Sequence, residues 1–222
     1  CGVVGQHAAE PAVGHVGLVH PLGGVLHDAL RLLFGADEQH LASTHDGVVH
    51  EFLGDAELDA RTLAFAKATG LRHVVLYGDR PRDPANSISY PNTAMTRGKP
   101  GLTLEIGDLG GREPEDVDTY LDALRRMLDH LGMLPGDFPE ANGHVLYERL
   151  VDVETPAGGL FTAAVRIGEI VGPGALLGTV TDYFGTPLAE LRAPTRGVVL
   201  MLRHKPPVNA GEGLVTIGVE VE

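Results

Sequence analysis

The chain has 222 residues, of which 43% are hydrophobic and 21% are charged, and its formal net charge is −13. This composition is that of a folded globular protein and excludes an intrinsically disordered chain. The 17 Lys and Arg residues are too few and too scattered for binding a nucleic acid, so a small molecule is the expected partner.

The cysteine and hydropathy patterns bear on the cellular compartment. The one cysteine, Cys1, has no internal disulfide partner, which favours a reducing compartment. No run approaches the roughly 20 apolar residues that cross a bilayer, and no basic segment followed by an apolar run resembles an export signal. We therefore expect a cytoplasmic protein with no membrane partner. Because the sequence begins at Cys1 instead of Met, we also expect it to be a fragment.

Residues 1–51 differ from the rest of the chain. The first 50 residues contain seven of the eleven histidines, one arginine (Arg31) and no lysine. A metal-binding tract, a divergent region and a shifted reading frame would each produce this bias, and the sequence leaves the three explanations open.

An α/β pattern begins at Gly54. Asp55 is a favourable N-cap for a helix that should run to Gly70. Residues 73–77 (HVVLY) predict a short buried strand, and the loop over residues 78–92, rich in Pro, Asp and Ser, should end it.

A second strand and a second helix follow. In residues 100–107 (PGLTLEIG), apolar side chains alternate with Thr103 and Glu105, which is the period of a strand. Residues 115–131 predict a helix that ends at Gly132. Its predicted buried face consists of Val117, Tyr120, Leu121, Leu124, Leu128 and Leu131. The expected fold class is α/β, with helices packed on a sheet.

Beyond about Asn142 the sequence predicts a separate β domain, because short β-branched runs alternate there with Gly and Pro. VGPGALL (171–177) recurs as VNAGEGL (208–214), and Gly159 in PAGG recurs as Gly197 in PTRG, so two similar halves should interlock. The pattern resembles the barrel-sandwich fold of biotinyl and lipoyl carrier domains. LRAPTRGVVLML lacks the lysine that a carrier needs, so a carrier function is rejected. The predicted domains are a catalytic α/β domain over residues 1–142 and a β-rich domain over residues 143–222.

Glu105 is the leading candidate for chemistry. A carboxylate in this strand is either an ordinary solvent-facing residue or a catalytic group at the rim of a sheet. The glycines around it would let the backbone turn sharply beside a ligand, and ligands of open α/β sheets gather at strand ends. These glycines are Gly101, Gly107, Gly110 and Gly111.

Three segments together resemble the succinylglutamate desuccinylase/aspartoacylase family, relatives of zinc carboxypeptidases. They are GKPGLTLEIGDLG, RRMLDHLGMLPG and TDYFGTPLAELRAPTRGVVLMLRHKPPVNAGEGLVTIG, and the likeness covers residues 52–222. It implies a truncated zinc-carboxypeptidase-like mixed sheet followed by a small barrel-sandwich-like β domain. It also implies a zinc-dependent hydrolase (deacylase) that cleaves the amide bond of an N-acyl amino acid or a similar small amide, a C–N bond other than a peptide bond. Glu105 matches the catalytic glutamate of the family.

The resemblance implies zinc ligands that this sequence matches only in part. The late histidine of the family is best matched by His45, and its early His and Glu pair by His7 and Glu10, with altered neighbours. The substrate-binding arginines of the family should lie between these motifs, where only Arg31 occurs, so the substrate-binding residues stay unassigned. Two alternatives remain open: a catalytically inactive binding or assembly protein on the same scaffold, and an incomplete fragment. A homo-oligomer is also open, and the β-rich domain should narrow the pocket mouth or support such contacts.

Overall fold

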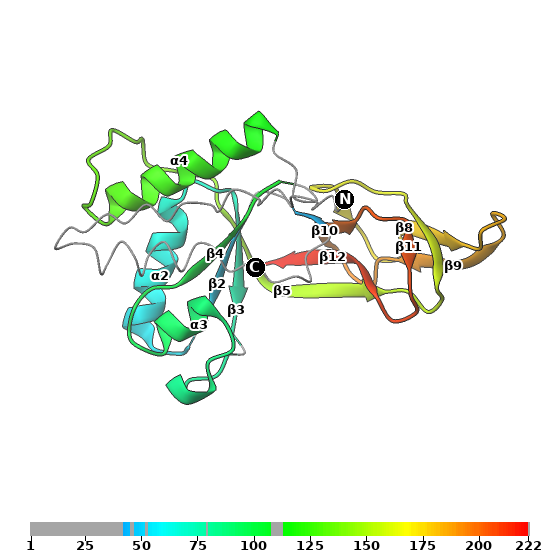
Figure 1. Cartoon of the computed structure of the whole chain (residues 1–222), viewed down its shortest axis with the longest axis horizontal. Coiled ribbons are helices and arrows are strands. Elements are labelled where there is room, and N and C mark those ends of the chain that lie inside the picture. Colours follow the sequence, from blue (N-terminus) through cyan, green and yellow to red (C-terminus); the bar gives the residue numbers. More distant parts are fainter. Residues whose placement is uncertain (1–41, 45–46, 52, 79, 108–112, 222) are drawn as a thin grey trace, which may run out of the picture.

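A computed structural model describes residues 42–44, 47–51, 53–78, 80–107 and 113–221. The helices gather at one end of the molecule and a purely β part lies at the other, with the long strands β5 (Val145–Glu154) and β12 (Gly213–Glu220) between them (Figure 1). None of the described helices combines the length and the apolar composition that a membrane crossing requires.

One mixed sheet of eight strands runs through both ends of the molecule. Its order is β1-β10-β12-β5-β3-β2-β4, with β7 attached to β10. The pairs β2–β3 and β3–β5 are parallel and the other pairs are antiparallel, which confirms a mixed α/β fold. The remaining strands of this sheet are β1 (Ala42–Thr44), β2 (Gly47–Glu51), β3 (His73–Tyr77), β4 (Leu102–Glu105), β7 (Ile170–Val171) and β10 (Gly197–Arg203).

Helix α2 (Ala56–Ala68) begins and ends at the predicted signals. The Asp55 carboxylate accepts hydrogen bonds from the backbone N–H groups of Glu57 and Leu58, at 3.1 and 3.0 Å, and so satisfies two of the free donors at the helix start. Gly70 follows the C-cap with a positive φ of 80°, a conformation that costs glycine little.

Helix α4 (Pro114–His130) packs with α2 on one face of the sheet, but through a different stripe than predicted. Its buried residues are Ala123 and Met127, whereas Val117 and Leu121 are 44% and 42% exposed. The backbone of α4 comes closest to α2, and the small Ala123 lies in the core that the two helices share with the sheet. Leu121 lies nearly opposite Ala123, since two residues turn a helix by about 200°. The predicted apolar face is therefore partly wrong.

The segment predicted as a loop over residues 78–92 contains the short helix η1 (Pro84–Asn86) and the start of α3 (Tyr90–Met95). The Ser89 hydroxyl accepts from the backbone N–H of Asn92 at 3.1 Å, and Pro91 occupies the first turn of α3, where its missing N–H is not needed. The buried Asn92 carboxamide in turn binds the backbone of Ile88 and Pro81, which ties this segment to the helix.

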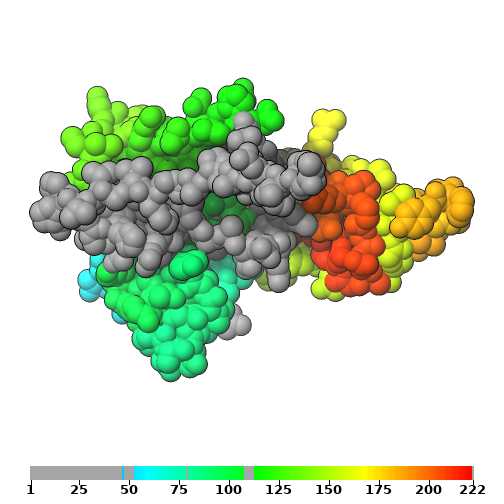
Figure 2. Space-filling model, in the orientation of Figure 1, coloured from blue at the N-terminus to red at the C-terminus, as the bar shows by residue number. Residues whose placement is uncertain are grey.

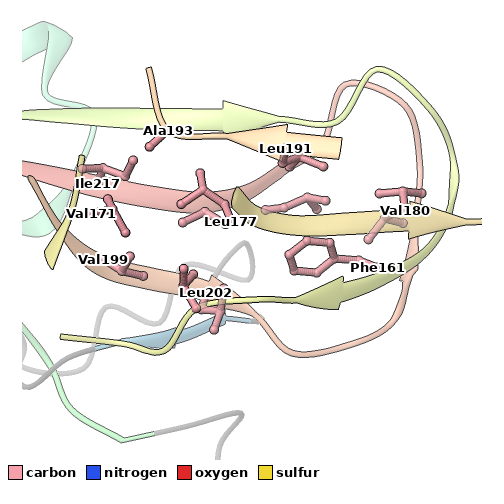
Figure 3. Close-up of a cluster of buried hydrophobic side chains, with 13 residues drawn as sticks. Phe161, Val171, Leu177, Val180, Leu191, Ala193, Val199, Leu202 and Ile217 are labelled. Atoms are coloured by element: carbon pink, nitrogen blue, oxygen red, sulfur yellow. The ribbon is translucent and has the colours of Figure 1, made fainter. Parts of the chain in front are cut away.

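The part of the chain after residue 142 contains only strands as regular elements. A second, four-stranded sheet has the order β11-β6-β8-β9 and consists of β6 (Gly159–Ala163), β8 (Leu176–Thr181), β9 (Pro187–Arg192) and β11 (Pro207–Val208). Side chains from both sheets meet in one apolar core around Leu177, Val180 and Ile217, all fully buried (Figure 3).

The internal repeat corresponds to an exchange of strands between two halves. Gly159 pairs with Val208 of β11, and Gly197 pairs with Val171 of β7, so each half donates a short strand to the other. Both positions require glycine for the same reason, which is that an added Cβ would clash with the backbone of a neighbouring strand. A Cβ on Gly159 would lie 2.3 Å from the carbonyl oxygen of Thr181, and a Cβ on Gly197 would lie 2.3 Å from that of Gly218.

Alanine at Gly197 should therefore destabilise the fold. A Cβ there cannot be accommodated without moving strand backbone, and overpacking of this kind costs about 1–3 kcal/mol in the free energy of unfolding. Gly172→Ala is the matched control, because no atom lies within 4 Å of the added Cβ. Urea-induced unfolding of both variants checks the prediction, which fails if the two variants are equally stable.

The barrel-sandwich expectation is not confirmed, and no closed barrel is seen among the described strands. The boundary predicted between residues 142 and 143 stays a prediction; β5 begins just after it and pairs with both β3 and β12. The exposed turn of the β8–β9 hairpin, Asp182 to Thr186, also contains no lysine.

Candidate functional site

Glu105 is the last residue of β4 and is half-buried. The apolar alternation of β4 determines which way it faces. Leu102 and Leu104 pack in the core under α2 and α4, so Thr103 and Glu105 face the opposite side of the sheet, the one without these helices. The candidate catalytic carboxylate is thus at a strand end, on the sheet face that α2 and α4 leave uncovered.

A lateral row of three residues defines this site. Gly47 of β2 is the register partner of Glu105 on one side and of His73 on the other, so all three share one face of the sheet. Gly47 is buried and has no side chain. Glu105 and His73 therefore flank a position from which no side chain projects.

His73 is held by Tyr147 of β5. Its Nδ1 and the Tyr147 hydroxyl form a hydrogen bond of 2.7 Å, and the two rings stack with centroids 5.6 Å apart. Both residues are buried, His73 at 6% exposure and Tyr147 at 0%. The sequence predicted the strand over residues 73–77 but indicated no role for His73. The available signal was a histidine opening an otherwise apolar strand.

Charged groups near Tyr77 contribute to the electrostatics of this face of the sheet. Burial raises the pKa of the Tyr77 phenol, the carboxylates of Asp152 and Glu105 raise it further, and the Arg80 guanidinium opposes them. Arg80 lies over the Tyr77 ring, with its Cζ 4.6 Å from the ring centroid. A cation and the Glu105 carboxylate thus act on one phenol, so this face of the sheet has both signs of charge.

The candidate zinc ligands His45, His7 and Glu10 lie outside the described residues. Within the described ranges, no group of three His, Cys, Asp or Glu side chains could hold a metal ion. In the sequence, His45 precedes Gly47, the register partner of Glu105, by two residues.

Tyr147 should make stability depend on alkaline pH. Burial, followed by the charge of Glu220, raises its pKa to about 12, against a weaker opposing effect of Arg72. Since the unfolded value is about 10, this stabilisation is complete below pH 10 and is lost as the pH rises through about 12. Across that window we expect the free energy of unfolding to fall by about 2–3 kcal/mol more in the wild type than in Tyr147→Phe. Urea-induced unfolding at several pH values measures the difference, and parallel pH curves would contradict it.

The chain is a mixed α/β protein. Its sheet has two helices on one face and a carboxylate at a strand end on the other face, and a β part is attached to it. A succinylglutamate desuccinylase/aspartoacylase from Rhodobacter sphaeroides matches with a TM-score of 0.70 and 25% identity, over 82% of this chain and 56% of that one. The ectoine utilization protein EutE (DoeB) from Ruegeria pomeroyi, in its apo structure, matches with a TM-score of 0.72 and 23% identity, over 80% of this chain and 56% of that one. An aspartoacylase family protein from Mesorhizobium loti matches with a TM-score of 0.65 and 18% identity, over 82% of this chain and 54% of that one.

These structures confirm the family resemblance seen in the sequence, to the succinylglutamate desuccinylases and aspartoacylases. No protein-family model matches the sequence, nor does any curated protein. The chain spans little more than half the length of the solved structures that it matches, between 54% and 56% of the three described above.

Proposed function

We propose that this chain is the larger part of a deacylase that hydrolyses the amide bond of an N-acyl amino acid, with Glu105 as the catalytic carboxylate. The observation that supports this most directly is the position of Glu105 at the end of β4, on the sheet face opposite α2 and α4, in a fold shared with solved members of a deacylase family.

The chemistry assigned to Glu105 is proton transfer. Hydrolysis of an amide needs an activated water to attack the carbonyl carbon and a proton for the departing nitrogen. A carboxylate within hydrogen-bond reach can take the proton from the water and then deliver it to that nitrogen, which is worth about 10²- to 10⁴-fold in rate. The products are a carboxylate and a free amine. The half-buried position of Glu105 suits this role, because part of the group stays accessible to substrate.

Zinc is proposed as the cofactor, with His45, His7 and Glu10 as its ligands. The described residues do not by themselves fit a zinc centre, since they contain no three-ligand group, so no step of the reaction is derived through the metal. The short sequence distance from His45 to Gly47, the partner of Glu105, supports His45 most. Stoichiometric zinc in the purified full-length protein, reduced in His45→Ala, is the expected measurement. An equal zinc content in both would remove His45 from the ligand set.

Arg80 is the proposed binding group for the carboxylate of the substrate. An N-acyl amino acid is an anion, and a guanidinium recognises a carboxylate with two parallel hydrogen bonds. The contact of Arg80 with Tyr77, whose phenol also responds to Glu105, supports its assignment to the same site. This arginine lies in the loop after β3, not in the region where the sequence resemblance had suggested substrate-binding arginines.

Replacing Arg80 with Ala should raise KM about 10- to 100-fold and leave kcat nearly unchanged, because a charge-assisted hydrogen bond to the bound carboxylate is lost. The KM of Arg80→Lys should lie between those of the wild type and Arg80→Ala, since lysine keeps the charge without the planar pair of donors. Arg61→Ala is the control, because Arg61 is exposed on α2. Steady-state kinetics with N-succinylglutamate and N-acetylaspartate check this, and an unchanged KM in Arg80→Ala would exclude the role.

The activity itself is tested with the full-length protein and a panel of N-acyl amino acids. Release of free amine, measured with and without a zinc chelator, is the expected result. A folded full-length protein that binds these compounds without cleaving any of them would instead support the binding or assembly protein.

The β part of the chain is proposed to be a barrel-sandwich-like module that narrows the pocket mouth or supports homo-oligomer contacts. Tyr183 and Phe184 support a contact role. They are 81% and 95% exposed in the turn between β8 and β9. The hairpin of these two strands lies at the end of the molecule away from α2 and α4, as the ribbon in Figure 1 and the orange surface in Figure 2 show. Large exposed aromatic side chains are typical of contact sites. Sedimentation of the chain with this hairpin shortened is the test, and an unaltered mass would exclude an oligomer contact there.

A further inference from the structure

The row Glu105, Gly47, His73 brings a carboxylate and a buried imidazole to the same face of the sheet. Adjacent strands are about 4.8 Å apart, so the Cα atoms of Glu105 and His73 are about 10 Å apart across β2. Gly47 puts no side chain between them. The structure has no direct hydrogen bond between Nε2 of His73 and the Glu105 carboxylate, so a link between these two side chains needs a bridging water.

The partner of His73 determines which ring nitrogen has the proton. Among the described residues, Nδ1 of His73 is the only hydrogen-bond partner of the Tyr147 hydroxyl. A fully buried phenolic hydrogen needs an acceptor, so the hydroxyl must donate to Nδ1. Nδ1 is then an acceptor, and a neutral His73 has its proton on Nε2.

We propose that His73 is a positioning residue for Glu105: Tyr147 keeps the imidazole neutral with an N–H at Nε2, and this N–H binds one Glu105 oxygen through one bridging water. The inference rests on the proposed function of Glu105 and extends it. One carboxylate oxygen is then fixed, and the other is presented to the reacting water in a single orientation. A neutral N–H donor orients the carboxylate without the charge of an imidazolium, which would hold it in its ionised form and weaken it as a base.

Nitrogen NMR of the His73 ring tests this proposal independently of any activity. In ¹⁵N-histidine-labelled full-length protein, we expect the shifts of an unprotonated Nδ1 and a protonated Nε2. Tyr147→Phe should shift Nδ1 and let the other tautomer appear, whereas Glu105→Gln should shift Nε2 and leave Nδ1 in place. Glu148→Gln, which alters an exposed residue of β5, should change neither signal. A proton on Nδ1, or an Nε2 shift that does not respond to Glu105→Gln, would overturn the proposal.

Kinetics supply the second readout. His73→Leu should lower kcat about 10- to 100-fold at nearly constant KM, the effect of a misplaced catalytic group. His73→Gln keeps an N–H at a similar distance from the backbone and should retain most of the rate. Equal losses in both variants at equal stability would reject a positioning role. If the wild-type chain shows no hydrolysis at all, the proposed function fails while the NMR comparison still decides whether His73 orients Glu105.

Discussion

Replacing Glu105 with Gln should lower kcat for amide hydrolysis about 10²- to 10⁴-fold with little effect on KM. Glutamine has nearly the same shape, so binding and packing should persist. A carboxamide cannot take a proton from water, so both proton transfers assigned to Glu105 would be lost. Steady-state kinetics on the full-length protein, with N-succinylglutamate as the first substrate, provide the measurement.

The control for this variant is Glu148→Gln, which makes the same chemical change at an exposed position of β5. Both variants should have the thermal unfolding midpoint of the wild type, since neither glutamate belongs to the hydrophobic core clusters. If Glu105→Gln keeps the wild-type rate, the carboxylate has no part in the reaction, and Glu105 is an ordinary solvent-facing residue of its strand.

Removing residues 143–222 should abolish folding of what remains. The deletion takes away β5, the neighbour of β3, and with it Tyr147, a fully buried residue that packs against Val75 and binds His73. Strand β3 would become an exposed edge with an uncovered apolar face, an arrangement prone to aggregation. Circular dichroism and gel filtration of residues 1–142 would show the loss. A monomeric, cooperatively folded fragment would instead confirm an independent domain with its boundary near residue 142.

A shortened β8–β9 hairpin is the matched control for that deletion. Replacing Asp182 to Thr186 with a two-residue Asn-Gly turn removes the exposed aromatic pair and keeps the paired strands. The core around Leu177 and Val180 stays intact, so the variant should fold with nearly wild-type stability. A loss of folding here as severe as in the deletion would show that the tip is structural.

Local signals in the sequence predicted the separate elements well. Asp55 and Gly70 mark the ends of α2, and the predicted strand over residues 73–77 is β3 as observed. Alternation around Glu105 gave the strand β4, and the recurring glycines marked the interlocked halves of the β part. These features were predictable because capping, strand period and close backbone contact each depend on a few neighbouring residues.

Contacts between distant segments were not predictable in this way. The stripe through which α4 packs depends on its contact with α2, a helix far away in the sequence, and the apolar period alone favoured a wider face. The hydrogen bond between His73 and Tyr147 joins residues 74 positions apart, and no local pattern announces it. Likewise, no local pattern announces the contact of Arg80 with Tyr77, which supports the role proposed for Arg80.

The sequence by itself determined the class of protein, the family resemblance and Glu105 as the candidate carboxylate, because these depend on composition, short motifs and strand period. Only the tertiary structure decided what stands beside that carboxylate. The register of β4, β2 and β3 puts Gly47 between Glu105 and His73, and the pairing of β3 with β5 brings Tyr147 to the imidazole. Strand order and register are set by the packing of the whole sheet, and a shift of one residue would turn each of these side chains to the other face.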